Sequence, residues 1–122
     1  MKNNDWYGVD FDGTLATYDG WGGNPVQPLG EPIPLMVSRV KGWLAHGVNV
    51  RILTARVGQH NPYREKHRQE IYEWLVEVFG RDDANKMIIT SAKDWGMVEL
   101  WDDNAVRVEK NTGRIVHDGE YE

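Results

Sequence analysis

The sequence contains no cysteine. This absence excludes disulfide frameworks, thiolate zinc sites, iron–sulfur clusters and cysteine nucleophiles. The sequence also lacks a run of the roughly 20 apolar residues that a membrane span needs. Its polar N-terminus, MKNNDWYGVD, has no apolar signal-peptide region. We therefore expect a protein of the reducing cytoplasm with no membrane partner.

An excess of positive charge is missing as well. Fourteen Lys and Arg stand against 19 Asp and Glu, and the formal net charge is −5, which does not favour nucleic acid or anionic membranes. One segment departs from this balance, because residues 51–68 hold five basic residues against the single acid Glu65, a local charge of +4. The segment predicts either a phosphate- or nucleotide-binding rim or a solvated helix face with i,i+4 pairs. Its basic residues are Arg51, Arg56, Arg64, Lys66 and Arg68.

The length and the periodicity of the chain predict a single α/β domain over residues 1–122. Gly- and Pro-rich residues 13–31 predict a small flap, and Asn61 with Pro62 predicts a helix start. Because strands alternate with helices, we expect a Rossmann-like three-layer sandwich with a mainly parallel sheet. The expected strands are 6–11, 48–53, 86–90 and 98–101. The expected helices are 32–46 and 62–79, and a terminal hairpin is expected at 105–117.

Polar side chains stand at the ends of all four expected strands, where ligands of parallel sheets gather. Carboxylates that crowd together need a cation or a shared proton, and Mg²⁺ prefers oxygen ligands. A Mg²⁺ site beside a lysine and a hydroxyl suits a phosphoryl group. A calcium loop starting at Asp10 is excluded, because its sixth and twelfth positions are Leu15 and Trp21. The strand-end residues are Asp10, Asp12, Thr54, Lys93, Asp102 and Asp103.

These residues also resemble the motifs of the haloacid dehalogenase superfamily, whose members are mostly phosphatases. Residues 10–15 (DFDGTL) resemble its first motif, and Thr54 in ILTAR resembles its second. Lys93 is the candidate for the third motif, and the two aspartates of LWDD resemble the fourth. The resemblance covers roughly residues 5–104.

The resemblance implies a mechanism that proceeds through an aspartyl-phosphate. Asp10 is the implied nucleophile, Asp12 the general acid and then base, and Thr54 a hydrogen-bond donor to the phosphoryl group. Lys93 would balance the negative charge. Mg²⁺ would be held by Asp10, the backbone carbonyl of Asp12 and Asp102, with Asp103 ligating or supporting. We also expect substrate contacts from Gly13, Thr14, Arg56 and Arg64.

The link between the third and fourth strands departs from the family pattern. Only seven residues separate Thr90 from Val98, whereas a helical crossover takes a dozen or more. Lys86 or Arg56 is therefore an alternative to Lys93 as the source of positive charge. The short link also keeps open a different function, a non-catalytic Mg²⁺- or phosphate-binding regulatory module.

The spacing of the motifs leaves no room for a cap, and capless family members tend to act on large substrates. The order Thr-Ala-Arg, loop, then Arg-rich helix faintly resembles the phosphatase half of polynucleotide kinase-phosphatases. The leading hypothesis is thus a Mg²⁺-dependent phosphomonoesterase for a nucleotide, a nucleic-acid end or another phosphoester.

Overall fold

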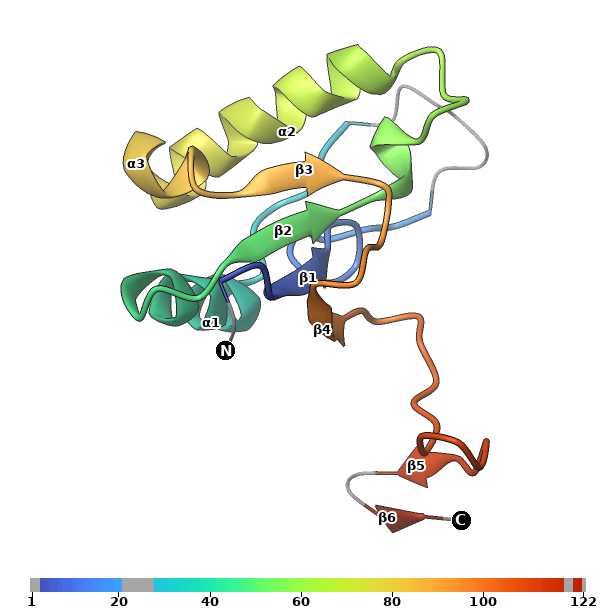
Figure 1. Ribbon diagram of the computed structural model, residues 1–122. Helices are drawn as coiled ribbons and strands as arrows, with labels where there is room; N and C mark the ends of the chain where they lie inside the picture. Colours follow the sequence, from blue (N-terminus) through green and yellow to red (C-terminus); the bar gives the residue numbers. More distant parts are fainter. Residues whose placement is uncertain (1–2, 21–27, 118–119, 122) are drawn as a thin grey trace.

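A four-stranded parallel sheet forms the centre of the protein (Figure 1). The computed structural model describes residues 3–20, 28–117 and 120–121. The strand order is β3-β2-β1-β4 and every pairing in this sheet is parallel, which confirms the predicted α/β, Rossmann-like class. The sheet strands are β1 (Trp6–Asp10), β2 (Val50–Leu53), β3 (Ile88–Thr90) and β4 (Met97–Trp101). The helices are α1 (Pro34–Ala45), the 3₁₀ helix η1 (Ala55–Val57), α2 (Arg64–Phe79) and α3 (Arg81–Ala84).

One face of this sheet carries the hydrophobic core. Side chains alternate between faces along a strand, so Val9 of β1 shares a face with Ile52 of β2 and Ile89 of β3, its partners in register. All three belong to one buried cluster with residues of both long helices. Both α1 and α2 therefore pack on this face. Their buried residues are Met36, Val37, Val40 and Leu44 from α1, and Ile71 and Leu75 from α2.

The opposite face is crossed by the extended segment 91–96, which runs from the end of β3 to the start of β4. Asp94 in this segment accepts hydrogen bonds from the indole of Trp6, at 2.7 Å, and from Arg51, at 3.0 Å. The Arg51 guanidinium also lies 4.6 Å from the centroid of the Trp6 ring. The predicted third layer is therefore not a helical layer: among the described residues this face carries only the short segment, which Asp94 fixes, and this explains how so few residues complete the crossover.

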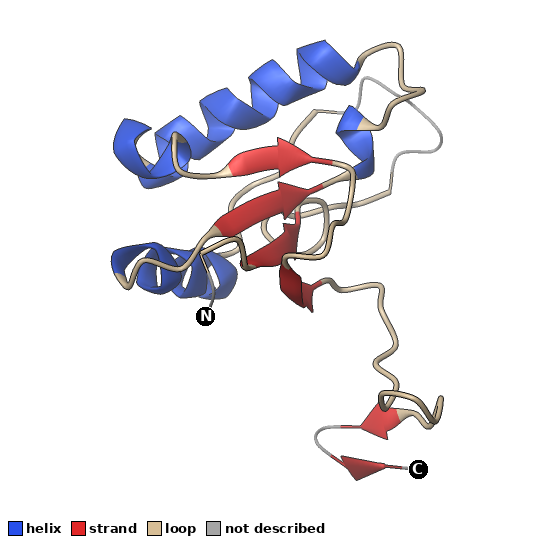
Figure 2. Ribbon diagram, viewed as in Figure 1, coloured by secondary structure: helices blue, strands red, loops and turns tan. Residues whose placement is uncertain are grey.

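Several predicted element bounds were wrong. The helix predicted to begin at Pro62, with Asn61 as its cap, begins at Arg64, because the Asn61 side chain accepts a hydrogen bond from the backbone N–H of Tyr63 in a turn before the helix. Gly80 ends α2 as predicted, with a φ of 87°, but the short helix α3 that follows it was not predicted. The other elements differ at their ends by one or two residues (Figure 2).

The base of the predicted flap is held by backbone hydrogen bonds next to the sheet. Thr17 N–H donates to the carbonyl of Glu31, and Ile33 N–H donates to the carbonyl of Leu15. The tip of the flap, with Trp21, lies outside the described residues. Among the described residues, no helix is long and apolar enough to cross a membrane.

The chain after β4 leaves the sheet as an arm that lies apart from the rest of the protein (Figure 1). The predicted terminal hairpin is present in part: Val108 and Ile115 form a single bridge, and Asn111 and Gly113 adopt positive φ in the turn between them. The remaining pairing is different from the prediction, because β5 (Val116–His117) pairs with a further strand, β6 (Glu120–Tyr121).

Candidate active site

A tight loop after β1 presents the first aspartates at the carboxyl edge of the sheet. The N–H groups of Leu15 and Ala16 both donate to the carbonyl of Phe11, and all three of these residues are fully buried. Gly13 has a φ of 89°, and a Cβ there would lie 2.6 Å from a carboxylate oxygen of Asp103. Only glycine fits both the backbone conformation and this close approach.

Three carboxylates converge beside this loop. Asp10 ends β1, and Asp102 and Asp103 follow the neighbouring strand β4; one ligand atom from each lies within 4.8 Å of the others. The buried hydroxyl of Thr14 ties the two loops together, since it donates to Asp103 Oδ1 at 2.9 Å and accepts from the Asp103 N–H at 2.9 Å. The order of the strands therefore brings together residues about 90 positions apart.

The electrostatics of this cluster favour a bound cation. The pKa of Asp10 is raised from 3.8 to about 7, and burial of the carboxyl is the largest cause. The charge of Asp102, a side-chain hydrogen bond with Asp103 and the charge of Asp103 raise it further. The carboxylates thus repel each other in a partly desolvated place, and a cation would relieve that repulsion. An all-oxygen donor set of this kind fits Mg²⁺.

Asp12 faces a different partner, the guanidinium of Arg56. Arg56 Nε donates to Asp12 Oδ2 at 2.8 Å, and Nη2 donates to Oδ1 at 2.9 Å, a bidentate ion pair. The Arg56 side chain is only 1% exposed. Its main chain is fixed as well, because the Asn61 side chain donates to its carbonyl at 2.8 Å. The site therefore contains a rigidly held cation beside its second aspartate.

Thr54 lies directly between β2 and η1 and is buried. Its hydroxyl oxygen accepts from the Arg56 N–H at 3.1 Å and so caps η1. The hydroxyl proton remains available for an anion in the site.

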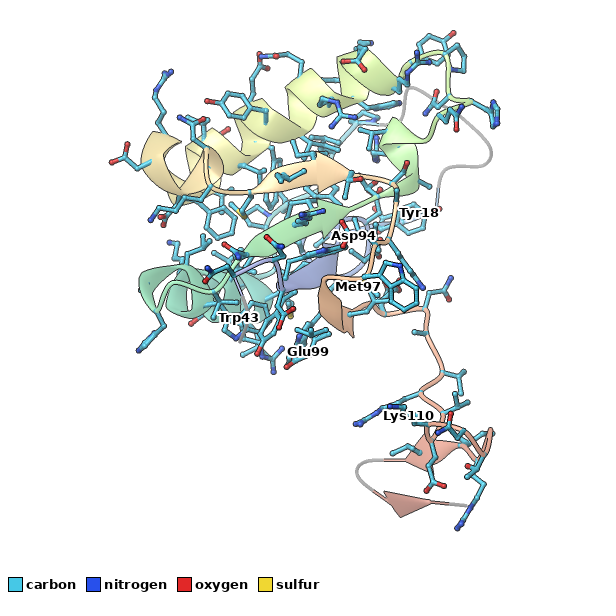
Figure 3. The ribbon with its side chains drawn as sticks, viewed as in Figure 1. Tyr18, Trp43, Asp94, Met97, Glu99 and Lys110 are labelled. Carbon is cyan, nitrogen blue, oxygen red and sulfur yellow. The ribbon has the colours of Figure 1, made fainter. Side chains whose placement is uncertain are left out.

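These groups border one open cavity of about 240 Å³. It brings together Asp10, Asp12, Thr54 and Arg56 from the predicted set, with Asp103 at its side. Sequence reasoning did not assign three residues of its lining to the site, Tyr18, Ala55 and Asn104. Tyr18 lies at the flap side and is 47% exposed (Figure 3). No motif marks Tyr18 or Asn104, and only the position of Tyr18 just after the loop that starts at Asp12 could have indicated it; Ala55 lies between the predicted residues Thr54 and Arg56.

Three predicted basic residues lie outside this cavity. Lys93, in the exposed crossover segment, is not part of the cavity lining. Lys86 precedes β3 and so lies at the amino end of that strand, away from the site at the carboxyl ends, and it pairs with Asp83 at 3.2 Å. Arg64 is 47% exposed and donates to the carbonyl of Gln59. Of the cations considered from the sequence, Arg56 is the one at the site.

The remaining basic residues of segment 51–68 do not form one rim. Arg51 pairs with Asp94 on the far face of the sheet, and Arg68 donates to the carbonyl of Ile89. The local charge of +4 is therefore distributed over different parts of the protein, with only Arg56 in the cavity.

Comparison of the chain with protein-family models, with curated proteins and with solved structures finds no match in any of the three.

Proposed function

We propose that the protein is a phosphomonoester hydrolase that uses Asp10 as its nucleophile. The observation that carries the proposal is the convergence of Asp10, Asp102 and Asp103 beside the cavity that Asp12, Thr54 and Arg56 line. Crowded carboxylates with a buried guanidinium and a hydroxyl are suited to a dianionic phosphate and a divalent cation. The resemblance of the sequence motifs to the haloacid dehalogenase superfamily supports the same reaction.

The reaction would proceed in two displacements. An Asp10 oxygen attacks the phosphorus, the ester P–O bond breaks, and the departing oxygen takes a proton from Asp12. Water then attacks the phosphorus of the aspartyl-phosphate, Asp12 accepts the proton of the water, and the bond to Asp10 breaks to release phosphate. In the described geometry Asp12 is held by Arg56, so the first proton transfer requires this ion pair to loosen as the substrate phosphate competes for the guanidinium.

Charge on the transferring phosphoryl group would be balanced from within the cavity. Arg56 takes the role that the sequence pattern gave to Lys93, because its guanidinium is beside Asp12 in the cavity lining. The Thr54 hydroxyl donates to a phosphoryl oxygen. Asp10, Asp102 and Asp103 would hold Mg²⁺, and the ion would supply further neutralisation of the phosphate charge.

The test is hydrolysis of an aryl phosphate in the presence of Mg²⁺ by the wild type and by Asp10→Asn. We expect the substitution to abolish turnover, because the amide cannot form the acyl-phosphate. The matched control is Asp82→Asn, which should retain wild-type activity. Asp82 is an exposed aspartate of α3, which precedes the amino end of β3. Normal turnover by Asp10→Asn would refute the mechanism.

A second candidate function is a non-catalytic Mg²⁺- or phosphate-binding regulatory module. Two observations favour it. Lys93 does not line the cavity, and both carboxylate oxygens of Asp12 accept hydrogen bonds from Arg56 and so are not free to transfer a proton in this geometry. Mg²⁺ binding without turnover on a broad panel of phosphoesters would favour this function over the enzyme.

The physiological substrate and the location remain predictions from the sequence. A nucleotide or a phosphorylated nucleic-acid end in the cytoplasm is the leading prediction. Parallel assays of a 3′-phosphorylated oligonucleotide, of a mononucleotide and of small sugar phosphates test the substrate, and turnover of the sugar phosphates alone would refute the prediction.

A further inference from the structure

The cavity of the candidate active site opens past an exposed aromatic side chain, that of Tyr18. Tyr18 lines the cavity together with Asp12 and Arg56 and is 47% exposed. The cavity volume of about 240 Å³ is smaller than the roughly 300–1,000 Å³ of pockets that enclose a whole ligand. A phosphate ester bound there would keep its phosphate group inside, and the rest of the molecule would extend through the mouth past Tyr18 (Figure 3).

The backbone that carries Tyr18 is held beside the second aspartate of the site. Asp12 and Ala16 form a β-bridge, so the loop that starts at Asp12 returns to it. Thr17, the residue before Tyr18, is anchored to the other side of the flap base. Its N–H donates to the carbonyl of Glu31 at 2.8 Å, and its hydroxyl oxygen accepts from the Glu31 N–H at 2.9 Å. Tyr18 is therefore presented at the mouth by a fixed segment.

This position is on the leaving-group side of the proposed reaction. The attacking and departing oxygens of a phosphoryl transfer lie roughly in line, on opposite sides of the phosphorus. Asp10 supplies the attacking oxygen and Asp12 protonates the departing one, so the leaving group lies on the side of Asp12. An aromatic ring beside it favours a planar leaving group, since stacked rings gain free energy beyond the apolar area that they bury.

The charge of the cavity favours a leaving group that is neutral. Among the described residues that line the cavity, three are acids and Arg56 is the single base. Residues 16–30 of the flap contain one charged residue, Asp19, and so add no cation to the mouth. The phosphate of the substrate would occupy Arg56. A second anionic group would therefore meet carboxylates, and the contact of like charges is costly.

We infer that the substrate carries a single phosphate group on a neutral, planar leaving group that stacks on Tyr18. The inference rests on the proposed function and makes Tyr18 a specificity-determining residue, which contacts the leaving group and takes no part in the proton transfers. A mononucleotide belongs to this class of substrate. The end of an oligonucleotide does not, because its further phosphates would extend through the mouth with no second cation in the described lining.

The test compares three phosphate esters of primary alcohols, in which the departing oxygens are chemically similar. They are benzyl phosphate, cyclohexylmethyl phosphate, whose ring is not planar, and 4-carboxybenzyl phosphate, whose ring is charged. With Mg²⁺ present, we expect the wild type to hydrolyse benzyl phosphate with a kcat/KM about tenfold above that of each of the other two.

Substitutions of Tyr18 assign the preference for the planar ring to this side chain. Tyr18→Ala should lose the preference for benzyl over cyclohexylmethyl phosphate, mainly through a higher KM for benzyl phosphate, because the stacking is made in the bound substrate as well as in the transition state. Tyr18→Phe keeps the ring and should keep the preference. The matched control is Tyr63→Ala, at a 40% exposed tyrosine outside the cavity lining, which should behave as the wild type.

Failure of the inference and failure of the proposed function give different results. If the wild type hydrolyses none of the three esters, the proposed function is overturned and the inference with it. If the wild type hydrolyses cyclohexylmethyl or 4-carboxybenzyl phosphate as well as benzyl phosphate, the inference alone is overturned. A Tyr18→Ala variant that keeps the preference, or a Tyr18→Phe variant that loses it, would overturn the inference in the same way. Circular dichroism checks the fold of the variants, and the comparison of the esters by the wild type is decisive without them.

Discussion

Replacement of Asp10 by asparagine should stabilise the metal-free protein at alkaline pH, although it removes the proposed nucleophile. Burial and the neighbouring carboxylates raise the pKa of Asp10 to about 7. At pH 8 the native protein therefore holds an ionised carboxylate in a place that disfavours it. Asparagine has nearly the same shape and no charge, so it removes this repulsion from the folded state.

The magnitude follows from the size of the pKa change. A rise from 3.8 to about 7 corresponds to about 4 kcal/mol, which we reduce to about 2 kcal/mol for solvent screening because the carboxyl is only half-buried. For a chain of this length, that gain corresponds to an increase in Tm of roughly 8 °C.

The sign of the pH dependence is fixed by the direction of the shift. Between the unfolded pKa near 4 and the folded pKa near 7, the native wild type holds a proton that the unfolded chain has released, so wild-type stability falls as pH rises. The loss of stability caused by ionisation of Asp10 is complete above pH 7, and at pH 5 it is less than half as large. The advantage of Asp10→Asn should shrink accordingly.

The assay is thermal unfolding of wild type, Asp10→Asn and the control Asp82→Asn in a chelator at pH 8 and pH 5. The control should change Tm little at either pH. Addition of Mg²⁺ at pH 8 should raise the Tm of the wild type and have much less effect on Asp10→Asn. The reasoning is wrong if Asp10→Asn is no more stable than wild type at pH 8, or if its gain is the same at both pH values.

Three other substitutions test the remaining parts of the site and of the fold. Arg56→Lys should reduce kcat for an aryl phosphate by at least about tenfold, because lysine cannot make the bidentate contact with Asp12, whereas Arg81→Lys on α3 should not; equal rates would contradict the role of Arg56. Gly13→Ala should lower the free energy of unfolding in urea by about 1–3 kcal/mol, because position 13 has a positive φ and a Cβ there would contact Asp103. Gly42→Ala, in open space on α1, should raise the free energy of unfolding by about 0.5–1 kcal/mol, and a Gly13→Ala variant as stable as the wild type would contradict this reasoning. Asp94→Asn should lower Tm at pH 7, with a smaller difference below pH 4, because the Trp6 and Gly96 N–H groups and Arg51 lower the pKa of Asp94 and its stabilisation is lost on protonation; a difference independent of pH would contradict the importance of its charge.

The sequence predicts the site best where local patterns determine the structure. The apolar run before Asp10 and the glycine at position 13 have local signatures, and both lie where the pattern placed them. The fourth acidic pair follows a short strand in the same way. Since parallel strands end at a common edge, the convergence of Asp10 with Asp102 and Asp103 follows from the class of fold.

The sequence predicts poorly where long-range pairing decides between equal local choices. Lys93 and Arg56 are both basic residues after a strand, and their difference depends on which one is buried against Asp12, 44 positions away from Arg56. The start of α2 depends likewise on Asn61, whose side chain bonds to the Arg56 carbonyl and the Tyr63 N–H instead of capping a helix that begins at Pro62. Neither outcome has a signature in the sequence near these residues.

The missing crossover helix and the geometry of the site are connected through the segment 91–96. A helix in this position would place the residue after β3 near the carboxyl edge of the sheet, where a lysine could reach a bound phosphate. Here the chain instead crosses the sheet in extended form and is fixed at Asp94 by Trp6 and Arg51. Lys93, one residue earlier, is left in the exposed link outside the cavity. In the proposed reaction, the cation beside the carboxylates is then Arg56, which makes its bidentate contact with Asp12 from the neighbouring strand end.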